Sequence, residues 1–286
     1  MKDKIILTLF ISPALILVGF FVYGFTGWSF RMSLTNWEFG KVIQYIGLEN
    51  YYRIFTDSTF HTSLLNSLQL IVLFVGITIP LGLFLAILLD LDVKGKQFFR
   101  IIFLIPLSFS FVASATMWTW MFSPSIGAIN SLLRVIGLEN LTQPWITSEN
   151  QALICIIITY IWQFSGFATL VYYAGLSSVS TDIREAAKID GANIWQRYTK
   201  VLIPMQKTAT MTVLMILLMY SLRVFDLVWL ITGGGPGISS EILPTLMYRT
   251  AFNRNMFGVG AGMGAIMFIL SIIIVIPFFL SLKGSD

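Results

Sequence analysis

The stretch IREAAKIDGANIWQRYTKVLIP, residues 183–204, decides how this chain is organised. It is polar and regularly patterned, and long apolar segments lie on both sides of it. A charged side chain at the centre of a bilayer costs about 3 kcal/mol, so a segment with this many charges does not cross a membrane. The stretch is therefore expected to be a structured insert at a membrane surface.

The composition places the chain among integral membrane proteins. Hydrophobic residues make up 56% of its 286 residues and charged residues 11%, and its mean hydropathy is +0.82. Soluble domains carry roughly a quarter charged residues. The net charge of +4 is spread thinly and indicates no nucleic-acid partner. A single Cys, Cys155, and a single His, His61, exclude a disulfide framework and a Cys- or His-rich metal site.

Six apolar stretches have the length of about 20 residues that crosses the hydrocarbon core of a bilayer. We expect an all-α polytopic membrane protein with six transmembrane helices in a single domain over residues 1–286, and a core bundle over about 62–281. The first stretch follows the charged N-terminal residues directly and lacks a small-residue cleavage site, which indicates an uncleaved span. The expected spans are about 5–28, 62–89, 101–122, 151–175, 208–232 and 257–281.

The distribution of Lys and Arg orients these spans. With the N-terminus inside, the inner segments hold eleven basic residues and the outer loops hold six, although the outer loops are longer in total. Cytoplasmic loops carry the excess of Lys and Arg. The sequence therefore predicts a multi-pass protein of the cell membrane, with both termini and residues 183–204 in the cytoplasm.

Local signals predict a short helix in the first half of the stretch. Asp182 and Glu185 have the spacing of a capping box, which would start this helix. Ala186 and Ala187 fall on its apolar face, where they would let another backbone come close. Gly191 would end it, because the left-handed conformation that follows a helix costs little only for Gly.

A second short helix is predicted after the Gly turn. Asn193, with Gln196 three residues later, can cap its start. Pro204 must end or bend it, since Pro interrupts the hydrogen bonds of a helix. Its apolar face consists of Ile194, Trp195, Tyr198, Val201 and Leu202. Two amphipathic helices around a Gly turn suit docking to a protein, and their aromatic residues equally suit a helix that lies on lipid.

The spacing of this stretch resembles the EAA loop of bacterial and archaeal ABC importer permeases. Glu185-Ala186-Ala187 is followed by three residues, Gly191, nine residues and then VLIP at 201–204. The last motif departs conservatively from the family pattern at its first and third residues. FDLVWLITGGGPG at 225–237 and LMYRTAF at 246–252 resemble the maltose-transporter-type permease. The extra N-terminal helices and large external domain of the enteric maltose version have no expected counterpart here.

The resemblance implies that the stretch contains a coupling helix, which docks into a groove on a cytoplasmic ATPase subunit. The coupling loop would cover about residues 178–207. Closure of two ATPase subunits would move the loop, and with it the spans, from inward-facing to outward-facing. The coupling residues would be Glu185, Ala186, Ala187, Asp190, Gly191 and Pro204.

The resemblance also implies partners. They are a second, homologous permease subunit in a heterodimer, two ATP-binding subunits that use ATP and Mg, and an extracytoplasmic solute-binding protein that delivers a sugar. Membrane lipid would surround the spans. The sequence has no G-x-x-x-x-G-K-[ST] phosphate loop, so ATP hydrolysis by that route needs a partner. The chain is therefore expected to be a transporter subunit rather than an enzyme, with no cofactor or metal of its own.

Two helical stripes combine aromatic rings with hydrogen-bonding groups, which suit the stacking faces and the hydroxyls of a sugar. The resemblance places both stripes where maltose-type permeases contact substrate, and ordinary helix packing by the aromatic residues is the alternative. The stripes are Tyr160, Gln163, Phe164 and Phe167 on the fourth span, and Tyr220, Ser221 and Val224 on the fifth.

Arg223 and Asp226 are charged residues within the expected fifth span. Spaced by three residues, they can pair on one helix. The cost of an intramembrane Arg favours a position facing the bundle or a wet cavity. We expect a structural intramembrane ion pair, with direct substrate contact as the alternative.

Other functions are the alternatives. Within the same family, the alternative substrate is glycerol-3-phosphate or another polyol, and a permease for it would carry the same motifs. A self-contained secondary carrier would show an internal inverted repeat and coupling carboxylates at mid-membrane. An intramembrane enzyme would need a catalytic cluster within a span, whereas His61 lies at an outer edge.

Overall fold

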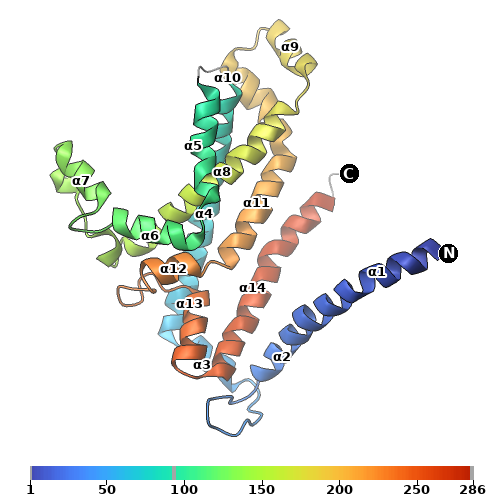
Figure 1. Ribbon diagram of the computed structural model, residues 1–286, viewed down its shortest axis with the longest axis vertical. Coiled ribbons are helices and arrows are strands. Elements are labelled where there is room, and N and C mark those ends of the chain that lie inside the picture. The colour runs from blue at the N-terminus through green and yellow to red at the C-terminus, as the bar shows by residue number, and fades with distance from the viewer. Residues whose placement is uncertain (1, 92–94, 284–286) are drawn as a thin grey trace. The chain divides into compact units, whose positions relative to one another are not determined.

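A computed structural model describes residues 2–91 and 95–283 (Figure 1). Every regular element of this part is a helix, and an isolated β-bridge joins Thr35 to Tyr45. The predicted all-α fold is confirmed. The N-terminal Met, residues 92–94 in the expected inner loop and the last three residues lie outside the described part. The cytoplasmic position of the two chain ends stays a prediction.

The described chain divides into two compact units, each described here by itself, and the single domain over residues 1–286 stays a prediction. The first unit contains the residues up to His61 and Leu243–Ile272. Buried Asn50 donates hydrogen bonds of 2.8 Å to the carbonyl oxygens of Ser33 and Thr35 within it. Its elements are α1 (Lys2–Val18), a π-helical turn (Gly19–Gly24), α2 (Phe25–Met32), α3 (Glu49–Thr56), α13 (Leu243–Tyr248), a π-helical turn (Arg249–Asn253) and the start of α14 (Phe257–Lys283).

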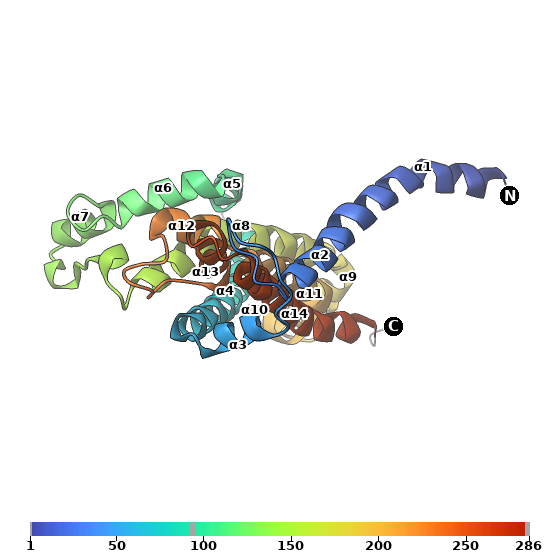
Figure 2. The same ribbon diagram turned by 90° about the horizontal axis from the view of Figure 1, so that it is seen from below.

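The second unit contains Thr62–Ile242 and the chain beyond Ile272. Figure 2 shows α5, α6 and α7 following one another along one edge of this unit. Its helices are most of α4 (Ser58–Asp90), then α5 (Lys96–Ser108), α6 (Phe111–Met121), α7 (Ala128–Val135), α8 (Ala152–Ser177), α9 (Thr181–Ile189), α10 (Ile194–Arg197), α11 (Lys207–Leu222) and α12 (Asp226–Ile231). Shorter turns are the 3₁₀ turns Glu139–Leu141, Trp145–Thr147 and Pro204–Gln206, and the π-helical turn Tyr198–Leu202.

α8 forms the core of the second unit. Most of its residues are buried, as expected of a helix that is apolar all round. Tyr160 and Tyr172 of α8 are fully buried in one cluster with Phe74 of α4 and Leu217 of α11. α5 crosses α8 at Gly166, where an added Cβ would lie against the backbone of α5. A residue without a side chain lets the two helices approach this closely.

Within the described residues, five helical segments are long and apolar enough to cross a membrane. Most of α5 together with α6 would make a sixth span, but the two helices are bent by 105° to each other. The predicted span 101–122 is thus two helices with a break at Phe109–Ser110. The Ser110 side chain accepts a hydrogen bond from the Ala113 N–H and so starts α6.

The predicted fifth span, 208–232, is wrong at both ends. α11 ends at Leu222, and 223–225 are not helical before α12 begins. Hydropathy continues across this break because α12 is as apolar as α11. At the inner end, the helical segment that could cross a membrane begins already at Ile194. The second half of the stretch 183–204 therefore runs directly into this span.

Buried Asn130 organises the loop between α7 and α8. Its side-chain NH₂ donates to the carbonyl oxygens of Pro124 at 3.0 Å and Gln143 at 2.9 Å. Its Oδ1 accepts from the Gln143 N–H at 3.2 Å and from the Trp145 indole N–H at 2.7 Å. The amide thus uses both of its donors and both acceptor positions, which fixes the loop.

Candidate functional site

α9 starts slightly earlier than the sequence predicts. Its N-cap is Ser180, and no side chain in this described segment caps the first turn. The predicted capping box of Asp182 and Glu185 is wrong, because the helix already includes both residues. Helical starts two residues apart compete here, and the backbone adopts the upstream one.

The turn between α9 and α10 follows the local signals. Gly191 has φ +75°, in the left-handed region that L side chains rarely adopt. The Ala192 N–H donates to the Ala187 carbonyl at 3.1 Å. α10 begins with a capping box, in which Asn193 and Gln196 exchange two side chain–backbone hydrogen bonds of 2.8 and 2.9 Å. The predicted Gly turn and Asn cap are confirmed.

The predicted coupling residues lie on the surface, with one exception. Ala187 is buried, whereas Glu185, Ala186, Asp190, Gly191 and Pro204 are exposed. Large apolar side chains are exposed among them, namely Ile189, Ile194 and Trp195. Charged and apolar groups therefore lie together on one exposed element. Their coupling role stays a prediction.

A polar cluster that the sequence analysis missed connects α9 to the spans. Arg184 donates from Nη1 to Asp90 Oδ2 at 2.8 Å, and from Nη2 to Asp90 Oδ1 at 3.2 Å and to the Leu176 carbonyl at 2.6 Å. The Tyr198 hydroxyl donates to Asp90 Oδ2 at 2.7 Å. The hydrogen bond with Asp90 raises the pKa of the Arg184 guanidinium above its ordinary value. The signal in the sequence was an acid at the end of a long apolar segment, where an unpaired charge is costly.

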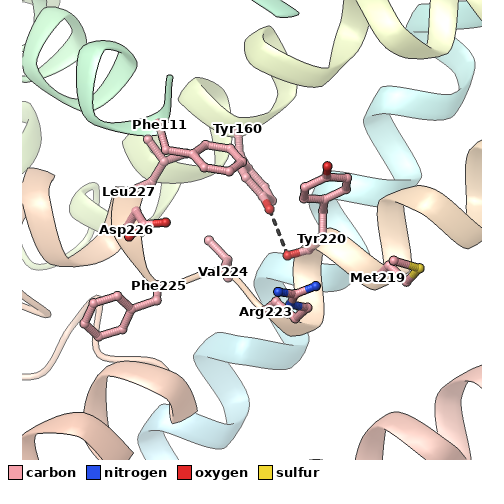
Figure 3. Close-up of a pocket in the computed structure, with 9 residues that line it drawn as sticks. All are labelled: Phe111, Tyr160, Met219, Tyr220, Arg223, Val224, Phe225, Asp226 and Leu227. Carbon is pink, nitrogen blue, oxygen red and sulfur yellow. Dashed lines mark hydrogen bonds between the residues drawn. The ribbon is translucent and has the colours of Figure 1, made fainter. Parts of the chain in front are cut away.

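A pocket of about 250 Å³ lies where α11 ends (Figure 3). Tyr160 of α8 is 1% exposed, and its hydroxyl donates to the Tyr220 carbonyl at 2.8 Å, drawn dashed in Figure 3. Tyr220 is 42% exposed, and its ring packs 4.7 Å from that of Phe164. The lining residues are Phe111, Tyr160, Met219, Tyr220, Arg223, Val224, Phe225, Asp226 and Leu227.

The pocket brings together some of the predicted substrate residues. Tyr160, Tyr220 and Val224 line it, whereas Gln163, Phe164, Phe167 and Ser221 lie elsewhere. The Gln163 side chain donates to the Phe109 carbonyl at 2.8 Å, at the break between α5 and α6. The Ser221 hydroxyl donates to the Leu218 carbonyl at 2.9 Å within α11. Both side chains thus donate to backbone carbonyl oxygens, and contact with substrate stays a prediction for all seven residues of the two stripes.

Arg223 and Asp226 both line the pocket and are exposed. α11 ends before Arg223 and α12 begins at Asp226, so the two residues do not share a helix as predicted. In the part of the chain that the structure describes, no ion pair joins them. The expected structural pair is wrong, and the alternative, contact with substrate, stays a prediction.

The search for a metal site covers the described residues only. Among them, no three His, Cys, Asp or Glu side chains gather where they could hold a metal ion. Cys155 is a free, buried cysteine on α8. The chemistry offered by this part of the chain is therefore hydrogen bonding, aromatic packing and charge.

Comparisons with known proteins agree with this geometry. Residues 78–284 match the family described as binding-protein-dependent transport system inner membrane component. The chain is 42% identical to a probable ABC transporter permease protein of Pyrococcus horikoshii over 281 residues, which cover 97% of this chain and 96% of that protein. It is 34% identical to a xylose/arabinose import permease protein of Haloferax volcanii, over 92% of this chain and 83% of that protein.

The fold is similar to that of a chain in a solved transporter. The crystal structure is that of a bacterial alginate ABC transporter in complex with an alginate pentasaccharide-bound periplasmic protein. The TM-score is 0.84 at 24% identity, over 97% of this chain and 93% of that chain, so the likeness concerns the fold alone. With a family match over most of its length, this chain belongs to the binding-protein-dependent transport system inner membrane components and is a multi-pass membrane protein.

Proposed function

We propose that this chain is the transmembrane permease subunit of an ATP-driven, binding-protein-dependent importer of a sugar or oligosaccharide. It forms half of the translocation pathway beside a second, homologous permease subunit. The relative from Haloferax volcanii is a xylose/arabinose import permease by name, which supports a sugar over glycerol-3-phosphate or another polyol. The termini and α9 lie on the cytoplasmic side of the cell membrane, in accordance with the excess of Lys and Arg there.

The observation that best supports this function is that short links join α9 to the spans on both of its sides. α8 ends at Ser177 and α9 begins at Thr181, so a very short link joins them. On its other side, the helical segment that enters the next span begins at Ile194, three residues after Gly191. A partner that displaces α9 therefore displaces two spans. This is the mechanical connection that an importer driven by a separate ATPase requires.

The partner at α9 is an ATP-binding subunit, and the complete importer contains two of them. Glu185 and Asp190 present charges to it, while Ala186 lets its backbone approach. These subunits bind ATP and Mg and hydrolyse the nucleotide, and this chain contributes neither cofactor nor catalytic group. An extracytoplasmic solute-binding protein delivers the sugar to the opposite end of the permease.

The pocket at the end of α11 is the part of the translocation pathway that contacts the sugar. Tyr220 offers an exposed ring for stacking. Arg223 donates hydrogen bonds and Asp226 accepts them, and a sugar hydroxyl can do both. The Tyr160 hydroxyl fixes the end of α11 at the pocket through its hydrogen bond to the Tyr220 carbonyl.

The test is reconstitution of the whole complex in liposomes with its binding protein. Sugar uptake and ATP hydrolysis are measured together, for the wild type and for Glu185→Lys. The variant should insert normally but lose the ATPase stimulation that the loaded binding protein causes, because a reversed charge opposes docking. Glu139→Lys, the same charge change on an exposed residue of the expected outer side, is the control. Uptake and stimulation at the wild-type level in Glu185→Lys would remove the coupling role of α9.

A further inference from the structure

α9 has little apolar contact with the rest of its unit. Of its nine residues, all of them described, Ala187 is buried and the other eight are not. Ile189 is 85% exposed. A helix this short is marginal in water on its own. Its position therefore depends on its short links to the spans and on polar bonds.

Arg184 supplies those bonds. Its guanidinium holds both carboxylate oxygens of Asp90, the last residue of α4, and the carbonyl of Leu176 near the end of α8. The side chains of Asp90 and Arg184 are 9% and 26% exposed, so the pair is shielded from salt more than a surface pair. A two-bond fork between Arg and a carboxylate fixes direction as well as distance. Lys, a point charge, cannot reproduce this geometry.

Tyr198 brings the far side of the Gly turn to the same carboxylate. Its hydroxyl donates to Asp90 Oδ2, and it lies in the π-helical turn between α10 and α11. Asp90 is thus bound from α9, which precedes the turn, and from the segment that follows it. Figure 1 shows α9 and α10 together at one end of the second unit.

Packing does not replace these bonds. A cavity of about 300 Å³ adjoins the cluster. Its lining comes from the end of α4, from α9 and from the segment around the π-helical turn: Asp90, Leu91, Arg184, Ala187, Lys188, Arg197, Tyr198, Val201 and Leu202. At this cavity, side chains leave space between α9 and the Tyr198 segment, and the polar bonds through Asp90 connect the two beside it.

We propose that Arg184 is a positioning residue that locks α9 to the ends of α4 and α8, and that the cluster of Arg184, Asp90 and Tyr198 carries the movement of α9 into these helices. The proposal rests on the proposed function, in which an ATPase subunit grips α9. The exposed residues of α9 receive the partner, and Arg184 passes its displacement to the spans. Without the lock, α9 keeps its short covalent links to α8 and to the next span, but it no longer holds the end of α4.

The experiment uses the complete complex in liposomes and three readouts. They are co-purification of the ATPase subunits, ATP hydrolysis with and without loaded binding protein, and sugar transported per ATP hydrolysed. The variants are Arg184→Gln, Arg184→Lys and Asp90→Asn. Lys188→Gln is the matched control, since this neighbouring cation of α9 also lines the cavity, whereas the ion pair of Asp90 among the described residues is with Arg184.

The Arg184→Gln complex should keep its ATPase subunits and its unstimulated ATP hydrolysis. The sugar transported per ATP should fall roughly tenfold or more, because the buried carboxylate of Asp90 loses its partner. Arg184→Lys should restore part of the ratio, and the double variant with Asp90→Asn should be no worse than either single variant. Lys188→Gln should transport normally. The specific signature is lost coupling at retained assembly, which a merely structural residue would not produce.

Two results would overturn the lock. One is a wild-type sugar-to-ATP ratio in Arg184→Gln. The other is loss of the ATPase subunits in Arg184→Gln without rescue by Arg184→Lys, which would make Arg184 a docking or folding residue. Failure of the proposed function is recognised separately, by normal coupling in Glu185→Lys.

Discussion

Replacing Gly166 by Ala is expected to push α5 away from α8. A Cβ at this position would lie closer than 3.0 Å to the Phe103 carbonyl oxygen, a distance that real Cβ atoms essentially never show. It would also lie 3.4 Å from the Cα of Leu104. Both obstacles are backbone atoms, which cannot rotate aside as the end of a flexible side chain can. The two helices must therefore separate.

The magnitude follows from this geometry. The helices must move apart by about 1 Å before the new methyl group reaches ordinary contact distance. Overpacking of this kind costs about 1–3 kcal/mol, and the better helix propensity of Ala offsets roughly 0.5–1 kcal/mol of it. The net loss is up to about 2.5 kcal/mol, or up to roughly 10 °C in the unfolding midpoint for a chain of this size.

The assay can use the single cysteine of the chain. Cys155 is buried on α8, the helix that carries Gly166, so a thiol-reactive dye reports when α8 is exposed on heating in detergent micelles. Gly76→Ala in α4 is the matched control, because its added Cβ would meet no described atom within 4 Å. The midpoint should fall in Gly166→Ala and stay level or rise in the control. A midpoint for Gly166→Ala equal to that of Gly76→Ala would refute the close crossing.

Three further substitutions test other parts of the second unit. Gln163→Leu removes the hydrogen bond to the Phe109 carbonyl and should cost about 1–3 kcal/mol in the same dye assay; an unchanged midpoint would contradict the role of this bond. Asn130→Ala removes four hydrogen bonds and should speed protease cleavage between α7 and α8, whereas exposed Asn140→Ala should not. Asn193→Ala should cost α10 about 1 kcal/mol, detected as faster amide hydrogen exchange in that helix; equal exchange would disprove the cap.

The features predicted best from the sequence are those decided within four or five residues. The left-handed turn at Gly191 and the cap at Asn193 depend on groups that are neighbours in the chain. The start of α9 was predicted too late because Asp182 and Glu185 also match a cap pattern. Ser180 and Asp182 both match the pattern of an N-cap residue, and the local sequence alone does not rank one above the other.

The two helix breaks were not predicted, because hydropathy averages over a whole span. Phe109–Ser110 and 223–225 interrupt helices in regions that stay apolar on both sides. These breaks matter for the candidate site, because residues at both of them line the pocket. Phe111 follows the first break directly, and Arg223 lies within the second. Counting along the helices places Tyr220 and Val224 at the pocket, whereas Gln163 and Ser221 do not line it, and substrate contact stays a prediction for all of them.

The pair of Arg184 and Asp90 joins residues 94 positions apart, and no local pattern connects them. The shape of α9 and its place are thus determined differently: the Gly turn and the Asn cap set the shape, and the long-range pair sets the place. An ATPase that works through α9 needs both, because a well-formed helix without this pair passes no displacement to α4. Asn193→Ala and Arg184→Gln separate the two requirements. The first should loosen α10 and leave the connection between Arg184 and Asp90 in place, and the second should leave the cap intact while it releases α9 from the end of α4.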